Sequence, residues 1–300
     1  MAGLLKRLQD WWERTPPAFT GPVWANLLGW QLLRVLFFNL TRTVGTYRRL
    51  PEATSYAKTL KEDGIVLIPD FLPRDAFAAI REAYEKESAG VPQKPLASKY
   101  IVPKDGKTKV GYGLFVPEEG GRLRTLLDEH LIENPVLRAI GASVVHHDIE
   151  RYRAPQVFIN KKMGDEYPDL NSDIYYHCDV SYPGVKAFLY LSDTDEGNGA
   201  FTYAKGTHRL TPKRLLWDYR KSIEHARNRA RVRDRSIIGD ESGRAWHCLT
   251  REEEKREGIR GTSMNGKANA LVVFNVMGFH RRGEFSSERP REFVMAYYRD

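Results

Sequence analysis

Apolar residues recur along the first 50 positions at the spacing of amphipathic helices. Residues 4–12 hold apolar side chains at helical intervals with charges between them, and a second apolar stretch, residues 23–40, carries polar residues on one side of a helix. Neither stretch offers the roughly 20 uninterrupted apolar residues of a membrane span. The sequence leaves two interpretations open: the helices pack on the domain, or residues 1–40 make peripheral contact with a membrane.

Beyond residue 55 the pattern predicts a short helix over residues 56–63. An apolar run bounded by glycine and proline, residues 64–69, is typical of a buried strand, and residues 70–87 predict a longer helix. Another helix is expected near residues 122–141. Residues 1–55 are therefore interpreted as a helical extension of a domain that covers residues 56–300.

The second half of the chain is dominated by short segments rich in aromatic and β-branched residues, which predict strands. These segments are residues 100–102, 112–116, 157–159, 185–191, 200–203, 270–274 and 293–298. Helices followed by strands predict an α+β protein with a mainly β core, built as a sandwich or barrel.

A polar, mostly helical insertion over residues 210–264 interrupts the strands. It has an arginine at every second position from Arg227 to Arg235. In a helix these arginines would spread around the axis as solvated charge, which is the prediction. An anion-binding or lid role is the alternative.

The charge and cysteine content narrow the function classes. The chain has 47 basic and 39 acidic side chains, a net charge of +8, and two cysteines. Two cysteines provide no disulfide framework, so a reducing cytoplasmic setting is expected. The positive charge could attract nucleic acid, anionic lipid or an anionic metabolite. No nucleic-acid recognition motif accompanies it, so we expect a small-molecule substrate and no nucleic-acid partner; the sequence does not predict the oligomeric state.

The candidate chemistry centres on the tripeptide His177-Cys178-Asp179. On a strand, residues i and i+2 project to one face, so His177 and Asp179 can bind one ion while Cys178 points away, which disfavours a zinc site. His280 follows the apolar run 270–279 and would complete two imidazoles and one carboxylate, the facial triad that holds Fe(II). The alternative is that both histidines and the aspartate are ordinary structural residues.

Arg291 opens the last predicted strand, shortly after His280. A guanidinium buried inside a barrel needs an anionic partner, and its fork suits a carboxylate bidentately. A dicarboxylate co-substrate that binds the metal through its 2-oxo end would place its far carboxylate there. A structural salt bridge is the alternative role.

Several motifs together carry a resemblance to a known family. They are the strand-and-helix segment 60–72, His177-Cys178-Asp179, residues 188–193, the hairpin 197–209 that ends in Gly206-Thr207-His208, His280 and Arg291. With this set, residues 58–300 resemble the phytanoyl-CoA dioxygenase-like (PhyH) branch of the Fe(II)/2-oxoglutarate-dependent oxygenases. The Gly-Thr-His turn looks structural, so His208 is expected outside the metal's ligand set.

The resemblance implies a double-stranded β-helix (jelly-roll) core, Fe(II) as cofactor, and 2-oxoglutarate and O₂ as co-substrates that yield succinate and CO₂. It implies that Phe188, Gln156, Asn160 and Lys161 line the 2-oxoglutarate pocket. Hydroxylation of an unactivated C–H bond is expected, with desaturation, ring formation and epimerisation open. Halogenating relatives lack the carboxylate of Asp179, so halogenation is not expected.

The substrate class follows from the apolar N-terminus beside a basic insertion. We expect a hydrophobic or amphiphilic small molecule, modified in biosynthetic tailoring. Hydroxylation of a fatty acyl group or acyl-CoA in lipid metabolism is the alternative, as is a non-catalytic lipid- or nucleic-acid-binding protein on the same fold. Tyr176, where the family often has tryptophan, departs from the family pattern, as do the insertion and the N-terminal extension.

Overall fold

The computed structural model describes residues 22–89, 94–95, 112–149, 155–160, 175–231 and 248–298. The helical elements are α2 (Val23–Leu27), α3 (Trp30–Thr43), η1 (Pro51–Ala53), α4 (Thr54–Asp63), α5 (Arg74–Ser88), α6 (Arg122–Leu127), η2 (Asp128–Ile132), α7 (Pro135–Val145), α8 (Pro212–Arg231) and α9 (Arg251–Glu257). The strands are β1 (Ile65–Ile68), β2 (Lys94–Pro95), β3 (Tyr112–Phe115), β4 (Gln156–Asn160), β5 (Val185–Tyr190), β6 (Phe201–Tyr203), β7 (Thr262–Ser263), β8 (Leu271–Asn275), β9 (His280–Arg282) and β10 (Arg291–Tyr298).

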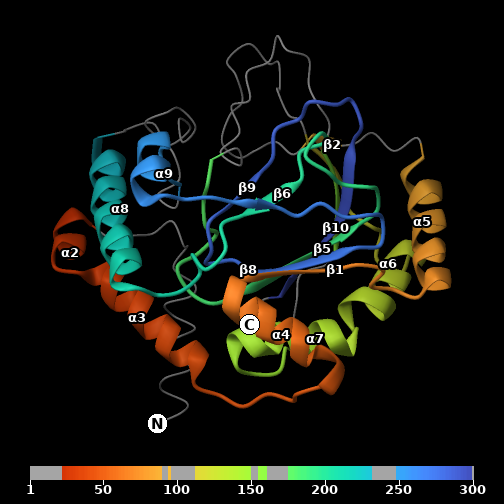
Figure 1. Ribbon diagram of the computed structural model, residues 1–300, viewed down its shortest axis with the longest axis horizontal. Helices are drawn as coiled ribbons and strands as arrows, with labels where there is room; N and C mark the ends of the chain where they lie inside the picture. The colour runs from red at the N-terminus through yellow and green to blue at the C-terminus, as the bar shows by residue number, and fades with distance from the viewer. Residues whose placement is uncertain are drawn as a thin grey trace.

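The described strands form two antiparallel sheets, one above the other in Figure 1. The larger sheet has the order β1-β8-β5-β10-β4-β3-β2, and the smaller has the order β7-β6-β9. Neighbours in the larger sheet come from distant parts of the chain; Phe188 of β5, for example, lies opposite both Val272 and Met295. Two facing antiparallel sheets with such crossovers are the arrangement that the predicted jelly roll requires.

Alternation along the central strands separates two core layers. In β5, Val185, Ala187 and Leu189 belong to the core layer that includes the helices. Phe188 and Tyr190 point to the opposite face and belong to the layer between the two sheets. Because side chains alternate along a strand, this single strand supplies both layers.

Helices cover the outer face of the larger sheet. Figure 1 shows α4 and α7 next to each other under this sheet, with α6 and α5 beside them. Their buried residues, such as Leu60, Ile80, Leu127 and Ile140, share one core layer with the sheet. The inner face is therefore left to the smaller sheet and to the side chains between the sheets.

Gly64 joins α4 to β1 at a point where no side chain fits. Its φ is +82°, and a Cβ there would lie 2.3 Å from Nδ1 of His208 and 2.6 Å from the hydroxyl of Tyr203. Glycine tolerates both the positive φ and the close approach. The turn thus brings the start of β1 against the residues that follow β6.

Two predicted helices are each broken in the structure. The helix expected near residues 122–141 consists of α6, the π-helical turn η2 and α7, because Pro135 starts α7 and the side chain of Asn134 caps it through Val136 N at 3.0 Å. The apolar stretch 23–40 divides into α2 and α3 at Gly29, which has a φ of +87°. The predicted helix over residues 4–12 and the predicted strand at 100–102 lie outside the described residues.

The described part of the segment 210–264 holds α8, α9 and β7. Arg227, Arg229 and Arg231 lie in α8, which agrees with the helix predicted for them; Arg233 and Arg235 lie outside the described residues. Figure 1 shows α8 next to α2 and α3 at one side of the sheets. Among the described helices, none is long and apolar enough to cross a membrane.

Candidate metal centre

His177 and His280 lie side by side because their backbones pair. His177 N donates to His280 O at 2.9 Å and His280 N donates to His177 O at 2.8 Å. His177 also forms a β-bridge with Cys248. The tripeptide therefore pairs with the edge of the smaller sheet that β9 forms, and Cys248 lies on its other side. The backbone of Asp179 is held as well, because its N–H donates to Val276 O at 3.0 Å.

The side chains of His177, Asp179 and His280 converge on one point. One ligand atom from each lies within 4.8 Å of the others, and His280 Nε2 is 3.8 Å from Asp179 Oδ2. Cys178, between the first two, is buried on the opposite face, as the alternation of a strand requires. The structure therefore brings together the three residues that the sequence analysis selected.

Backbone carbonyls fix the tautomer of both imidazoles. His177 Nδ1 lies 2.9 Å from Tyr175 O, and His280 Nδ1 lies 2.8 Å from Gly278 O. Because a carbonyl oxygen only accepts, each Nδ1 carries the hydrogen, and the lone pair of each Nε2 is available to a metal. Two imidazole nitrogens and a carboxylate at one point are a donor set that suits Fe(II).

The protonation states also suit metal binding. Burial, and then the proximity of His177, lower the pKa of His280 to about 3, so its imidazole is neutral at ordinary pH. Burial acts to raise the pKa of Asp179, but Lys186 and the two histidines outweigh it and hold that pKa well below the usual range. The site thus presents a neutral His280 imidazole and an ionised Asp179 carboxylate.

Arg291 lies at the start of β10 and is buried. Its Nη1 donates to Gly199 O, and its Cζ lies 4.9 Å from the centre of the Phe293 ring. Since β10 alternates, Arg291 and Phe293 lie on the strand face that looks into the layer between the sheets. A buried guanidinium on this face is suited to an anionic group that enters between the sheets.

The structure places some of the other predicted pocket residues but not all of them. Phe188 lies at the centre of the inner layer, 4.6 Å between ring centroids from Phe293 and 5.2 Å from Phe201. Gln156 is half-buried in β4, and Asn160 ends that strand opposite Arg291 in the register. Lys161 lies outside the described residues, and of Asn160 only the backbone position is described.

Comparison with known proteins decides the family. The profile of the phytanoyl-CoA dioxygenase (PhyH) family matches residues 60–293. The chain belongs to the PhyH family. No curated protein has significant sequence similarity to this PhyH protein. The match confirms the predicted enzyme class, an Fe(II)/2-oxoglutarate-dependent dioxygenase, and its cofactors.

Solved structures show the same fold at low identity. The epimerase SnoN, in complex with Fe³⁺, alpha ketoglutarate and nogalamycin RO, has a TM-score of 0.53 and 14% identity, over 83% of this chain and 84% of SnoN. AviO1 from Streptomyces viridochromogenes Tue57 has a TM-score of 0.51 and 14% identity, over 84% of this chain and 97% of AviO1. EctD from S. alaskensis, with 2-oxoglutarate and 5-hydroxyectoine, has a TM-score of 0.51 and 13% identity, over 81% and 74%. The predicted α+β jelly-roll fold is confirmed.

Lys186 is a site residue that the sequence analysis missed. Its Nζ lies 2.9 Å from Asp179 Oδ2 and 5.1 Å from the centre of the Tyr297 ring. The sequence could have indicated Lys186, because it lies two residues before Phe188 and the two side chains therefore share the inner face of β5. A lysine at such a position in an otherwise apolar strand indicates a carboxylate partner inside the barrel.

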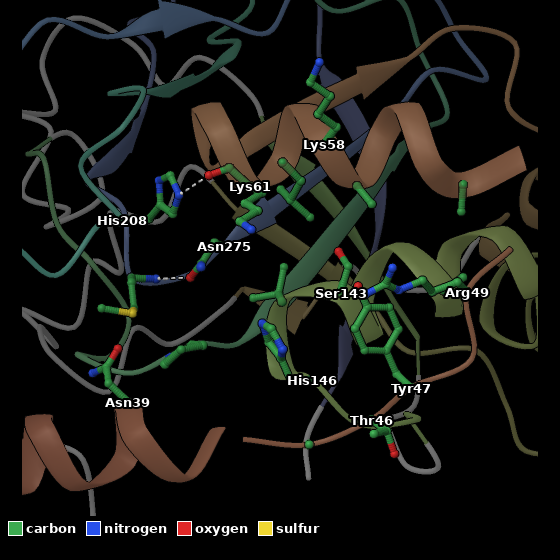
Figure 2. A pocket seen from close by; sticks show the side chains of 18 of the residues that line it. Asn39, Thr46, Tyr47, Arg49, Lys58, Lys61, Ser143, His146, His208 and Asn275 are labelled. Atoms are coloured by element: carbon green, nitrogen blue, oxygen red, sulfur yellow. Dashed lines mark hydrogen bonds between the residues drawn. The ribbon is translucent and has the colours of Figure 1, made fainter. Parts of the chain in front are cut away.

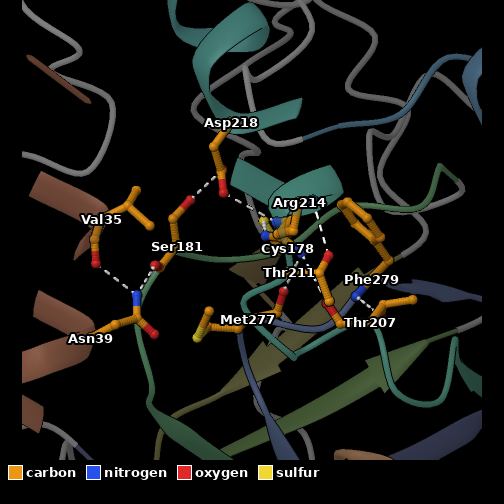
Figure 3. Close-up of polar contacts among 10 residues, drawn as sticks. All are labelled: Val35, Asn39, Cys178, Ser181, Thr207, Thr211, Arg214, Asp218, Met277 and Phe279. Carbon is orange, nitrogen blue, oxygen red and sulfur yellow. Dashed lines mark hydrogen bonds and ion pairs between the residues drawn. The ribbon is translucent and has the colours of Figure 1, made fainter. Parts of the chain in front are cut away.

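A second missed residue, Arg214 of α8, contacts both segments that carry the candidate ligands (Figure 3). Its Nη2 donates to Cys178 Sγ at 3.0 Å, and its Nη1 donates to Met277 O at 2.9 Å and to Thr207 O at 3.1 Å. Its Nε lies 3.2 Å from Asp218 Oδ2. One buried guanidinium thus ties α8 to the residue between His177 and Asp179 and to the segment that leads to His280.

Asp218 extends this network to the segment after the tripeptide. Its Oδ1 accepts from the Ser181 hydroxyl at 2.7 Å (Figure 3). Burial raises the pKa of Asp218 despite the opposing effect of Arg214, so the ionised pair carries a desolvation cost. The sequence analysis did not single out Arg214 or Asp218. Their i, i+4 spacing is compatible with an ion pair along a helix but does not indicate that the pair is buried.

His208 lies apart from the three candidate metal ligands. Its Nε2 is 3.2 Å from Lys61 O, and it lines a cavity of about 970 Å³ between α3, α4 and α7 (Figure 2). None of the three ligands lines this cavity. The position of His208 agrees with its expected exclusion from the ligand set.

Proposed function

We propose that His177, Asp179 and His280 are the iron ligands of this PhyH protein and that Arg291 binds the far carboxylate of 2-oxoglutarate. The observation that carries the proposal is the convergence of two carbonyl-fixed imidazoles and a carboxylate within 4.8 Å. When bound, iron and 2-oxoglutarate use O₂ to oxidise a C–H bond of the substrate, with release of succinate and CO₂. The predicted reaction is hydroxylation.

The surrounding residues would orient these groups and exclude water. The carbonyls of Tyr175 and Gly278 hold the two imidazole rings, whereas Lys186 pairs with the carboxylate of Asp179 and would compete with the metal for it. Phe188 would form the apolar wall beside 2-oxoglutarate. Gln156, Asn160 and Lys161 are retained as its polar contacts on and after β4.

The substrate proposed is a hydrophobic or amphiphilic small molecule, hydroxylated in biosynthetic tailoring. Aromatic rings surround His280: the ring centroids of Phe274, Phe201 and Tyr203 lie at 5.2, 5.3 and 6.3 Å. These rings are buried and make the surroundings of His280 apolar, which favours an apolar part of the substrate near the metal. The net charge of +8 favours an anionic group elsewhere on the substrate. SnoN, which binds nogalamycin RO, shows that this fold can hold a small organic molecule with iron and alpha ketoglutarate.

We propose the domain boundaries that the sequence predicts. Residues 56–300 form the oxygenase domain, and residues 1–55 form its N-terminal extension. A cytoplasmic location is proposed with this arrangement.

Anaerobic titration with Fe(II) and then 2-oxoglutarate tests the site assignment. A visible charge-transfer absorption should appear in the wild type and in an Asp193→Asn control, because Asp193 pairs with Lys267 away from the ligands. It should be absent in His177→Ala. Retention of the absorption in His177→Ala would contradict the assignment.

A second experiment tests the substrate class. Acyl, lipid and natural-product scaffolds are screened for compounds that stimulate succinate release. Stimulation by an amphiphilic scaffold, with oxygen incorporated into it, supports the proposal. Stimulation only by small neutral polar amino acids would contradict it.

A further inference from the structure

Helix α3 turns its polar residues, together with Val35 and Phe38, toward the protein and presents large apolar side chains to the solvent. Gln31 and Arg34 are only 5% exposed. Arg42 is also buried and donates to Pro183 O at 3.0 Å, and Asn39 donates to Ser181 O at 2.9 Å. In a water-soluble protein an amphipathic helix normally buries the opposite side.

The outward side of α3 and the residue after it is a stripe of large apolar side chains. Leu33 is 58% exposed, Leu40 is 64% exposed and Val44 is 73% exposed, with Leu36 between them at 41%. These positions fall within an arc of about 80° at 100° per residue. The four side chains therefore form one continuous apolar stripe along the outward side of the helix.

Helix α2 enlarges this face. Its Trp24 and Leu27, and Leu28 after it, are exposed as well. Of the nine large apolar side chains that are exposed among the described residues, seven lie between residues 24 and 44. Isolated exposed leucines are ordinary, but a concentration of this kind marks an interaction surface. We call Trp24, Leu27, Leu28, Leu33, Leu36, Leu40 and Val44 the α2–α3 face.

Unpaired cations adjoin the α2–α3 face. Leu36 and Leu40 also line the cavity of about 970 Å³. Arg49, Lys58 and Lys61 line the same cavity (Figure 2). None of the described residues that line this cavity carries a carboxylate. Among the described ion pairs, none includes these three cations. The cavity end of the α2–α3 face is thus positive and not neutralised locally.

We infer that the α2–α3 face and its cationic cavity form a docking surface for an anionic lipid bilayer. The leucines and Trp24 would enter the boundary between headgroups and acyl chains, while Arg49, Lys58 and Lys61 meet the lipid phosphates. A second copy of the chain fits less well, because a two-fold contact through this face would bring the cations of both copies together. This surface would place the enzyme beside substrates dissolved in the membrane, but it does not depend on the reaction.

Vesicle co-sedimentation of the full chain tests the inference. The protein should bind phosphatidylcholine vesicles that contain phosphatidylglycerol, bind pure phosphatidylcholine vesicles much more weakly, and be released by high salt. Lys58→Gln with Lys61→Gln should lower binding by about tenfold or more, because each cation near an anionic surface contributes about fivefold. Leu36→Ser with Leu40→Ser should lower it by about tenfold through lost apolar burial.

Val116→Ser provides the matched control, because Val116 is similarly exposed but follows β3 near the other edge of the larger sheet. Its vesicle binding should equal that of the wild type, and circular dichroism should show that all variants are folded. Absence of binding to any vesicle would overturn the inference, as would binding that neither double variant alters. A wild-type dimer that Leu36→Ser with Leu40→Ser converts to a monomer would identify the face as a self-association surface instead.

Discussion

The backbones of His177 and His280 hydrogen-bond to each other in both directions, with N–O distances of 2.9 and 2.8 Å. This pairing fixes the separation of the two imidazoles before any ion is present. Their ring centroids lie 4.4 Å apart, and each ring is held by a carbonyl through Nδ1. A site organised in this way needs little rearrangement to bind a metal, which favours tight binding.

His280→Ala should abolish Fe(II) binding at micromolar concentrations without unfolding the protein. It removes one of three ligands, whereas the backbone bonds to His177 remain available to alanine. Isothermal titration with Co(II) or Fe(II), with circular dichroism as a check of folding, measures the effect. Unchanged affinity would show that the metal binds elsewhere.

Arg291→Gln should raise the concentration of 2-oxoglutarate needed for half-maximal binding by about 10- to 100-fold, because a charge-assisted contact is removed. The affinity for Fe(II) alone should be unaffected. Arg291→Lys should recover part of the loss, since it restores the charge but not the fork. An unchanged 2-oxoglutarate requirement in Arg291→Gln would mean that another residue anchors the co-substrate.

Arg214→Met should weaken both stability and metal binding. It leaves the carboxylate of Asp218 buried without its cation, which costs about 3–5 kcal/mol of unfolding free energy, and removes the contacts to Cys178 and Met277. Loss of such outer contacts typically lowers metal affinity by about 10- to 100-fold.

The double variant Arg214→Met with Asp218→Leu separates these two effects. Without a buried unpaired charge it should recover most of the stability in urea unfolding. Its metal affinity should stay low, because the hydrogen bonds to the segments that carry the candidate ligands are still missing. Recovery of both quantities would show that Arg214 acts only on stability.

Lys186→Met should tighten binding of a divalent metal by about tenfold. The ammonium group lies 2.9 Å from Asp179 Oδ2, so it competes with the metal for that carboxylate and repels the cation. Lys267→Met, at an exposed lysine paired with Asp193, is the control. Weaker metal binding in Lys186→Met would instead indicate that Lys186 positions Asp179.

The stability of the protein should fall below pH 6.5 in part because of His208. Burial lowers the pKa of His208 from its ordinary value of 6.5. Between these two pKa values the unfolded chain binds a proton that the folded chain does not, so the free energy of unfolding decreases as the pH falls; above pH 6.5 this contribution is constant.

One such group changes the slope by at most about 1.4 kcal/mol per pH unit. Urea unfolding of the wild type and of His208→Gln between pH 4 and 8 measures it as the difference between the two curves. The variant should show the shallower slope below pH 6.5. Parallel curves would contradict the assignment.

The sequence by itself determined the local pattern of this protein. The aromatic and β-branched residues of segments 185–191 and 293–298 predict β5 and β10, and the i, i+2 spacing of His177 and Asp179 predicts that their side chains share a face. These features depend only on neighbours in the chain. The positions of His280 after the apolar run 270–279 and of Arg291 at the start of the last predicted strand suggested both residues, and the family resemblance supplied the enzyme class.

Only the tertiary structure decided which distant segments meet. The pairing of His177 with His280 depends on sheet register, and the contact of Lys186 with Asp179 depends on where the tripeptide lies above β5. Arg214 reads as a surface charge in sequence, because nothing local shows that α8 packs over Cys178.

The orientation of α3 is the clearest case. Hydrophobic periodicity shows that its polar residues gather on one side of the helix but cannot show which side meets the protein. Hydrogen bonds from Asn39 to Ser181 O and from Arg42 to Pro183 O hold the polar side inward, and Leu33 and Leu40 face outward as a result. The side of an amphipathic helix that becomes buried is decided by the segments that pack against it, and these are set by the tertiary structure.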